Sequence, residues 1–429
     1  MEITITPISE VQHQAAIEAS NEELQSHFQK AYEEFRPKAE VRGFRKGKVP
    51  LAMIKKLYGE AIEQDALDTI ADTLYRQAME ENNIRPLGQP AMVERDFKRG
   101  LYFRFKVRYD VRPSITLRTV KGLKLEKPVR RITDADIDAE LMHLRRSKAA
   151  PERADRVTDP DHIVTADVQE LDATGAPIIG KRSSAARFHL YDDTLAPEIR
   201  QALATAEPGQ TYRVTVRHSP AEEATALHLE LAVTAIDRVT PPPLDDALVA
   251  AITGGSSTTV DAFRTKMRSD LERYSNEEAE ARLNNAIADE LVREHDFPVP
   301  DSLVEAFLDS FVDDIRSRSK GRALPRDFNE ASFRTENRAY AIWQAKWMLI
   351  KERIAEVEQI TVTEEDLARA AEADAARMGI EKEKLRSYYA TSGSVRERLL
   401  SEKIMAFLKQ NARITETEAP SGPSRLATV

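Results

Sequence analysis

Cysteine is absent from this chain of 429 residues, and its absence removes several classes of function at once. Without thiols there is no disulfide scaffold, no thiolate metal site and no cysteine nucleophile. Aromatic residues make up only 6% of the chain, whereas charged residues make up 31%. No apolar run approaches the roughly twenty residues that a membrane-spanning helix needs. We therefore expect two or three domains rich in exposed helix surface, and no membrane partner.

Patterns typical of catalytic and cofactor sites are missing as well. The eight histidines are scattered, without the paired spacing of a metal site. Glycine-rich nucleotide-binding loops and nucleophile elbows do not occur. The sequence thus predicts no metal, no cofactor and no ATPase. The first residues contain neither the cationic nor the apolar region of a signal peptide, so we expect a cytoplasmic location.

The most informative stretch is residues 41–50, which read Val-Arg-Gly-Phe-Arg-Lys-Gly-Lys-Val-Pro. Gly43 and Gly47 can turn the chain sharply, and Pro50 suits the first turn of a helix. Between residues 36 and 56 there are eight basic residues and one acidic residue, although the chain has a net charge of −9. This pattern predicts an exposed cationic loop that carries Phe44 and binds a phosphate backbone beside an apolar notch. The alternative is an ordinary solvated turn.

The rest of the chain predicts a multidomain α+β protein. Residues 1–112 combine an N-terminal strand, helices and a hairpin around 91–111 into an α+β domain, and residues 113–150 form a linker and a helix. Residues 151–240 alternate short apolar runs with turn signals, which predicts a small antiparallel sheet and one helix. Residues 241–415 are almost entirely helical, with narrow apolar stripes typical of an elongated body with arms. Residues 416–429 are predicted to be disordered.

Residues 43–50, followed by Ile54 and Tyr58-Gly59, resemble the ribosome-docking signature of the trigger factor family, the bacterial chaperones at the exit of nascent chains. Further similarity lies at 297–300, 360–363 and 385–389, so the resemblance covers nearly the whole chain to about residue 415. It implies contact with the large ribosomal subunit, both with its RNA and with a protein beside the tunnel exit. The residues implied in this contact are Gly43, Phe44, Arg45, Lys46, Gly47 and Lys48.

By position, residues 151–240 resemble the prolyl isomerase domain of the FK506-binding-protein type that the family inserts here. The strand that should carry Phe after Asp167 carries Val168 instead, and the segment before the short helix reads Leu-Ala-Pro-Glu-Ile, ending at Ile199. The later Tyr-Gly loop is shortened to residues 218–221, and Tyr212 is one of only three aromatic residues left. Because such a pocket needs several aromatic walls, we expect the fold without a competent pocket and predict no catalytic residue here.

The resemblance further implies that the helical body, 241–415 with 113–150 packed on it, holds nascent and unfolded polypeptides. It also implies a homodimer off the ribosome. Aromatic residues suit promiscuous contact with many clients, and the candidates are Phe307, Phe311, Trp343 and Trp347. The alternative for each is packing inside an arm. Two other functions stay open at this stage, namely an active prolyl isomerase and a ribosome-independent holdase or nucleic-acid binder.

Overall fold

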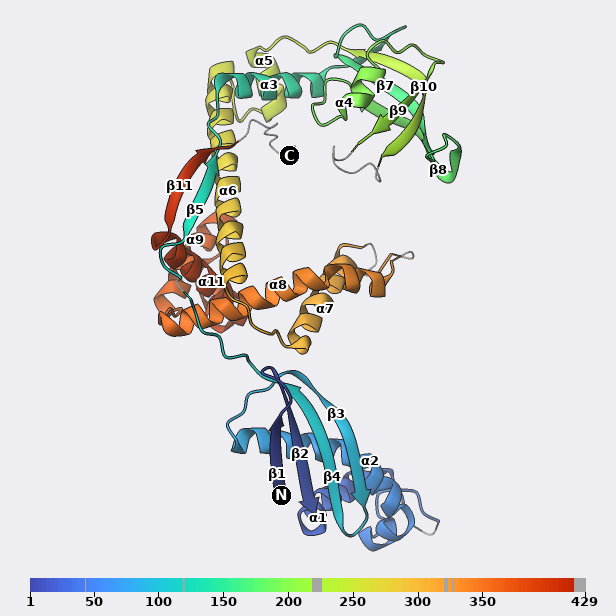
Figure 1. Cartoon of the computed structure of the whole chain (residues 1–429), viewed down its shortest axis with the longest axis vertical. Helices are drawn as coiled ribbons and strands as arrows, with labels where there is room; N and C mark the ends of the chain where they lie inside the picture. Colours follow the sequence, from blue (N-terminus) through green and yellow to red (C-terminus); the bar gives the residue numbers. More distant parts are fainter. Residues whose placement is uncertain (43, 119, 218–225, 320–322, 326–327, 420–429) are drawn as a thin grey trace. The chain divides into compact units, whose positions relative to one another are not determined.

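The computed structural model describes residues 1–42, 44–118, 120–217, 226–319, 323–325 and 328–419 (Figure 1). Contacts between residues divide the chain into two units. One unit holds Met1–Leu125 and Asn284–Ile414, and the other holds Glu126–Leu283 and Thr415–Val429. Within the described part of the chain, a membrane-crossing helix is absent, because none of the helices is both long and apolar enough.

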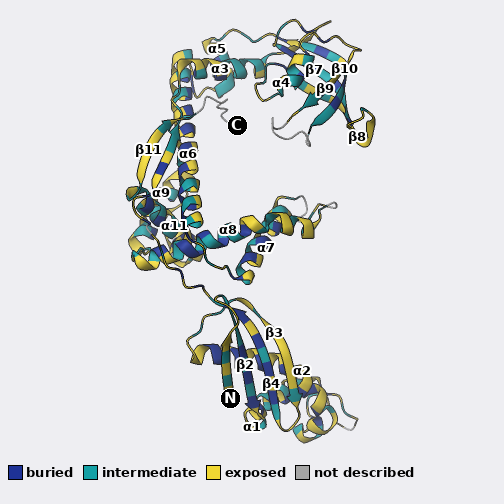
Figure 2. Ribbon diagram, viewed as in Figure 1, coloured by how far each residue is buried: buried dark blue, intermediate teal, exposed yellow. Residues whose placement is uncertain are grey.

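The first unit begins with a four-stranded antiparallel sheet. Its spatial order is β1 (Glu2–Pro7), β2 (Gln12–Ser20), β4 (Tyr102–Asp110) and β3 (Leu87–Lys98). Successive side chains of a strand point to opposite faces, so one face can be apolar throughout. Figure 2 shows buried residues along the central strands of this sheet. The buried face includes Ala15, Ile17, Ala19, Phe103, Phe105 and Val107.

Two α-helices, α1 (Asn21–Phe35) and α2 (Leu51–Glu81), cover this buried face, and a single 3-10 turn, η1 (Arg36–Lys38), follows α1. Ser20 and Glu23 form a capping box that starts α1 directly at the end of β2. The apolar stripe of α1 then places Leu24, Phe28 and Tyr32 in the same core as the strands. The long connection between α1 and α2 is therefore anchored to a packed body at both ends.

The C-terminal portion of the first unit, from Asn284 onward, is mainly helical. It contains α7 (Asp301–Arg318), α8 (Glu330–Val357), α9 (Glu364–Met378), α10 (Lys382–Thr391) and α11 (Gly393–Gln410). The α7 and α8 helices pack together through Val304, Leu308 and Ala341. The buried imidazole of His295 accepts a 2.9 Å hydrogen bond from the Arg118 N–H, which ties the segment after β4 to the end of α6 (Val260–Glu294).

The second unit contains a five-stranded antiparallel sheet. Strands β6 (Pro151–Arg153), β10 (Leu227–Val239), β7 (His162–Leu171) and β8 (Pro177–His189) lie in this order, and β9 (Thr211–Val216) also pairs with β10. The short helix α4 (Pro197–Ala202) packs Ile199 into the core of this sheet. Helices α3 (Asp134–Lys148), α5 (Asp246–Thr253) and α6 share a separate core.

The C-terminal end of the described chain differs from a simple disordered tail. Residues Arg413–Glu418 form strand β11, which pairs with β5 (Lys124–Val129). The Arg413 N–H donates to the carbonyl of Leu123 over 2.7 Å, and the backbone bonds continue as far as Ala419. Pairing with β11 satisfies backbone groups along the edge of β5 that would otherwise have no partner strand. Residues 420–429 lie outside the described residues.

The multidomain α+β class predicted from the sequence is confirmed. Antiparallel sheets occur in both units, and the C-terminal part of the chain is helical. The 3.6-residue periodicity and the alternating strands were sufficient to predict this, because each element has to bury one apolar face.

Asp366 provides a test of what stabilises the C-terminal helices. Its carboxylate accepts from Thr363 at the start of α9 and from the Lys403 ammonium of α11 at 2.6 Å. The Lys403 hydrogen bond, followed by the Thr363 backbone bond, holds the pKa of Asp366 well below its ordinary value. A lowered folded-state pKa stabilises the fold above the unfolded-state pKa of about 3.9, and this contribution is lost as the pH falls toward the folded-state value.

We therefore predict that Asp366→Asn lowers the free energy of unfolding of this region at pH 7, because the bonds from Lys403 and Thr363 favour the charged carboxylate. The difference from wild type should shrink when the pH is lowered to about 2.5. Urea unfolding monitored by circular dichroism measures both values. Asp289→Asn, at an exposed position of α6, is the matched control and should have little effect at either pH. A deficit for Asp366→Asn that does not depend on pH would contradict this account.

Candidate functional site

The connection between α1 and α2 is held by buried side chains at both ends. Ala39 and Val49 are 1% and 0% exposed, and Ile54 in the first turn of α2 is fully buried. The Tyr58 hydroxyl donates a 3.0 Å hydrogen bond to the carbonyl oxygen of Glu40. With these ends fixed in the core, the residues between them project as a short loop.

Two tight turns shape the loop itself. The N–H of Phe44 donates to the carbonyl of Val41 over 3.0 Å, and the N–H of Lys48 donates to that of Arg45 over 2.9 Å. Gly47 has a φ of +78°, in the left-handed region that favours glycine, so a side chain at this position would be strained. Gly43, predicted to make the first turn, lies outside the described residues.

The predicted docking residues are exposed on this loop. The Phe44 ring is 41% exposed, which is unusual for a large aromatic side chain flanked by cations. Arg45, Lys46 and Lys48 are exposed as well, and Gly47 is half-buried between them. The sequence predicted that this loop would be exposed, and its described side chains from Phe44 to Lys46 and at Lys48 are exposed.

Most of the loop's positive charge is not neutralised within the chain. Lys46 pairs with Glu40 at 2.6 Å, and the Lys46 hydrogen bond lowers the pKa of that carboxyl group. Among the described residues, Arg42, Arg45 and Lys48 take part in no ion pair. An exposed ring beside unpaired cations can bind an anionic backbone and insert into an apolar notch.

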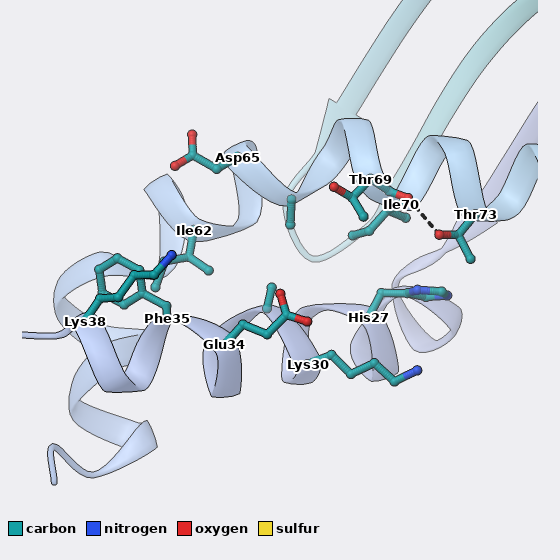
Figure 3. A pocket seen from close by; sticks show the side chains of 12 residues that line it. His27, Lys30, Glu34, Phe35, Lys38, Ile62, Asp65, Thr69, Ile70 and Thr73 are labelled. Atoms are coloured by element: carbon teal, nitrogen blue, oxygen red, sulfur yellow. Dashed lines mark hydrogen bonds between the residues drawn. The ribbon is translucent and has the colours of Figure 1, made fainter. Parts of the chain in front are cut away.

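A groove of about 350 Å³ lies between α1 and α2 (Figure 3). Its apolar end is formed by Phe35 and Ile62, while Lys30 and Glu34 line it along α1. Burial, with a smaller contribution from Lys30, lowers the pKa of His27 at the other end. Side chains of both charges line the groove, so it has no evident preference for an anion or a cation.

Aromatic side chains of α7 and α8 stack into a continuous row, called here the aromatic edge and made of Phe307, Phe311, Tyr340 and Trp343. The ring centroids are 6.5 Å apart for Phe307 and Phe311, and 5.6 Å apart for Phe311 and Tyr340. Tyr340 and Trp343 are 5.8 Å apart with their planes 9° from parallel. Tyr340 is 53% exposed, so the row offers open aromatic surface to solvent.

Three of the four predicted client-binding residues belong to this edge, and the fourth does not. Trp347 is 9% exposed and packs in the helical core, with the Lys351 ammonium 5.6 Å from its ring centroid. Tyr340 was missing from the sequence candidates. Its spacing of three residues from Trp343 places both on one face of a helix, and this signal could have found it.

Ion pairs join α7 to α8 in addition to these ring contacts. Asp301, Glu305 and Asp309 follow one another at every fourth residue of α7. Arg338 pairs with Asp301 at 2.7 Å and with Glu305 at 2.8 Å, while Arg334 pairs with Glu305 and Asp309. Cross-helix pairs of this kind hold the two helices together, so the stacked rings do not have to do so alone.

In the second unit, Asp167 has a structural role. Its carboxylate accepts from the N–H of Ala185 at 2.9 Å and from the Arg182 guanidinium at 3.0 Å, both on β8. Ala185 has a φ of +55°, so these bonds hold a strained residue next to an irregularity in the β7–β8 pairing. The backbone bond from Ala185, followed by Arg182, lowers the pKa of Asp167.

The other residues of the expected isomerase pocket are part of the domain's apolar packing. Ile199 is 7% exposed in the core, and Val168 and Tyr212 are partly buried against it. The Tyr212 hydroxyl donates a hydrogen bond to Gln210. The shortened loop at 218–221 lies outside the described residues. The described residues also contain no group of His, Asp and Glu side chains arranged to hold a metal ion.

Family comparisons agree with this arrangement. The family model described as bacterial trigger factor protein matches residues 1–144, and the model of the C-terminus of that protein matches residues 259–410. A trigger factor from Salinibacter ruber is 32% identical over 95% of this chain and 93% of its own length. A trigger factor from Chloroherpeton thalassium is 30% identical, over 98% of this chain and 99% of its own.

A solved structure of a trigger factor chaperone, reported for promiscuous substrate recognition in folding and assembly, has a similar fold. It covers 96% of this chain and 99% of its own with a TM-score of 0.51, at 18% identity. The two near-full-length relatives carry the family assignment, and the structural match agrees in fold. The chain belongs to the trigger factor family, the ribosome-associated chaperones of bacteria that bind nascent chains.

Proposed function

We propose that this chaperone docks at the exit of the ribosomal tunnel through Phe44, Arg45 and Lys46, with Gly43, Gly47 and Lys48 shaping and charging the same loop. The observation that carries the proposal is an exposed ring on a loop whose two ends are buried, beside Arg45 and Lys48, which form no ion pair among the described residues. The cations suit phosphates of the ribosomal RNA, and the ring suits an apolar notch on a protein beside the exit. The location that follows is the cytoplasm.

The aromatic edge is our proposed client-binding surface. Stacked rings offer flat apolar area that many unfolded sequences can bury, and the ion pairs between α7 and α8 keep that area in place. Binding through such contacts requires no ATP, because it is driven by reversible burial of apolar client surface. Docking beside the exit would raise the effective concentration of the nascent chain, so weak contacts are sufficient.

We propose that each part of the chain has its own role, according to the site that it carries. Residues 1–112 dock, residues 151–240 form the isomerase-like domain, and residues 113–150 together with 241–415 form the client-binding body. Off the ribosome, a homodimer would cover the exposed apolar side chains of this body. We expect no appreciable isomerase turnover from this domain, because Val168 and only three aromatic residues are left to build a pocket that needs several aromatic walls.

Ribosome docking is tested by replacing the loop tip. We expect wild type to co-sediment with ribosomes at low salt and to dissociate as the salt concentration rises. The variant F44A/R45A/K46A should remain in the supernatant with an unchanged circular dichroism spectrum. The control R76Q/R85Q removes two exposed cations beyond the loop and should still pellet. Equal pelleting of wild type and the loop variant would favour the ribosome-independent holdase.

Client binding is tested with F311A/Y340A/W343A. Losing several stacked rings should weaken binding of a fluorescently labelled unfolded polypeptide by about fivefold or more, equivalent to about 1 kcal/mol. Fluorescence anisotropy measures the dissociation constant. The control Y274A/Y388A removes two exposed tyrosines outside the aromatic edge. If this control weakens binding as much as the triple variant does, the aromatic edge is not the client site.

Isomerase activity is tested on the full chain with a proline-containing peptide. Uncatalysed isomerisation takes tens to hundreds of seconds at 25 °C, and we expect this chain to leave that time essentially unchanged. An active prolyl isomerase measured in parallel provides the positive control. Turnover well above the uncatalysed rate would show that the domain assembles a working pocket despite Val168.

A further inference from the structure

The turn between β3 and β4, residues 98–101, is a second exposed feature of the docking domain. In Figure 1 this turn lies at the lower end of the domain, the end from which the loop between α1 and α2 also projects. Leu101 at the turn is 64% exposed. Its carbonyl accepts a 3.0 Å hydrogen bond from the N–H of Asn21, which fixes the turn to the start of α1.

Arg99 of this turn is clamped by a buried carboxylate. The Glu63 side chain on α2 accepts from Arg99 Nε at 2.6 Å and from Nη2 at 3.2 Å. Glu63 is only 8% exposed, and it also accepts a hydrogen bond from the hydroxyl of Tyr32. A β-carbon at Gly59 would lie 2.8 Å from Arg99 Nη2, so the absence of a side chain there makes room for the guanidinium.

This clamp leaves part of the guanidinium available. The Arg99 side chain remains 52% exposed although one edge of its fork is bound to Glu63. A guanidinium has five N–H donors in a rigid plane, and Nη1 is not used by Glu63. An arginine whose orientation is already fixed loses little side-chain entropy when it binds a phosphate. The geometry is thus prepared for an anionic partner.

Further cations lie on the same turn as Arg99 and on the turn of α2 before Gly59. Lys55 and Lys56 lie four and three residues before Gly59 on α2, and both are exposed. The Lys55 ammonium is 5.0 Å from the Tyr32 ring centroid, next to the clamp. Lys98 lies over the ring of Tyr102, and the hydrogen bond with the Tyr102 hydroxyl raises its pKa. Among the described residues, none of these three lysines takes part in an ion pair.

We propose that Lys55, Lys56, Lys98, Arg99 and Leu101, called here the hairpin patch, form a second RNA-binding surface on the docking domain. The proposal rests on the proposed ribosome docking and extends it. Its ligand is a phosphate backbone, because the patch is cationic and its one clamped arginine holds Nη1, which Glu63 does not use, in a fixed orientation. Leu101 then packs against sugars or bases beside the bound phosphates.

A second attachment point would give the docked chaperone a defined orientation. One loop can pivot about its contact, whereas a loop and a rigid turn hold the domain at two points. The second contact forms within an already bound complex, so its effective concentration is high and a weak contact contributes. The loop would carry most of the affinity, and the hairpin patch would add to it and to its salt dependence.

The test compares variants in ribosome co-sedimentation over a series of salt concentrations, using the full chain. The key variant is E63Q/R99Q. The amide oxygen at position 63 can still accept the hydrogen bond from the Tyr32 hydroxyl, and the net charge of the chain is unchanged. We expect its affinity to fall about threefold to tenfold at low salt, and the slope of log affinity against log salt to decrease by about one. The control R76Q/R85Q loses two positive charges outside the patch and should behave as wild type.

A single substitution covers the case in which E63Q/R99Q does not fold. Lys98→Glu changes an exposed side chain and should weaken binding in the same direction, with an unchanged thermal melting temperature. Wild-type affinity and slope for both folded variants would overturn the proposal. A loss of affinity with an unchanged salt slope would also overturn it, because the contact would then be with a ribosomal protein.

The loop variant F44A/R45A/K46A separates this proposal from the one on which it rests. If the loop variant loses ribosome binding while the hairpin variants bind as wild type does, only the second surface is disproved. If the loop variant binds as wild type does, the proposed docking mode itself fails. A reduced affinity in both sets, each with a smaller salt slope, supports a docking surface of two parts.

Discussion

The N-terminal α+β domain depends on burying the two ends of a loop that otherwise faces solvent. Ala39 and Val49 are inside the core, and Ile54 continues this anchoring into α2. An exposed aromatic ring among cations gains nothing from folding by itself, so the neighbouring apolar residues must supply the stability. The loop can therefore remain exposed for a partner without loosening the domain that carries it.

The same separation of stability from function recurs in the helical part of the chain. The α7 and α8 helices bury Val304, Leu308 and Ala341, and ion pairs through Arg334 and Arg338 join them further. Exposed aromatic surface is then tolerated at Tyr340. Large exposed apolar groups are normally a liability, and here they lie on two helices that other contacts already hold together.

Residues 151–240 show how a packed sheet can form without the aromatic residues that a prolyl isomerase pocket would need. The sheet, the short helix and the buried Ile199 are all in place. Val168 stands where the resemblance led us to expect an aromatic residue, and Asp167 accepts hydrogen bonds from Ala185 and Arg182. The packing of a sheet needs apolar residues of suitable volume, whereas a pocket needs particular rings at particular positions.

The sequence by itself determined the class of the fold, the exposed cationic loop and the family. These depend on local patterns, namely the periodicity of apolar residues, turn chemistry at Gly47, and a run of like charges. Only the tertiary structure decided that Trp347 is buried while Tyr340 is exposed, that Asp167 is bonded to β8, and that Arg99 is clamped by Glu63. Each of these outcomes depends on which side chains meet when separate elements pack together, and no local sequence pattern encodes that.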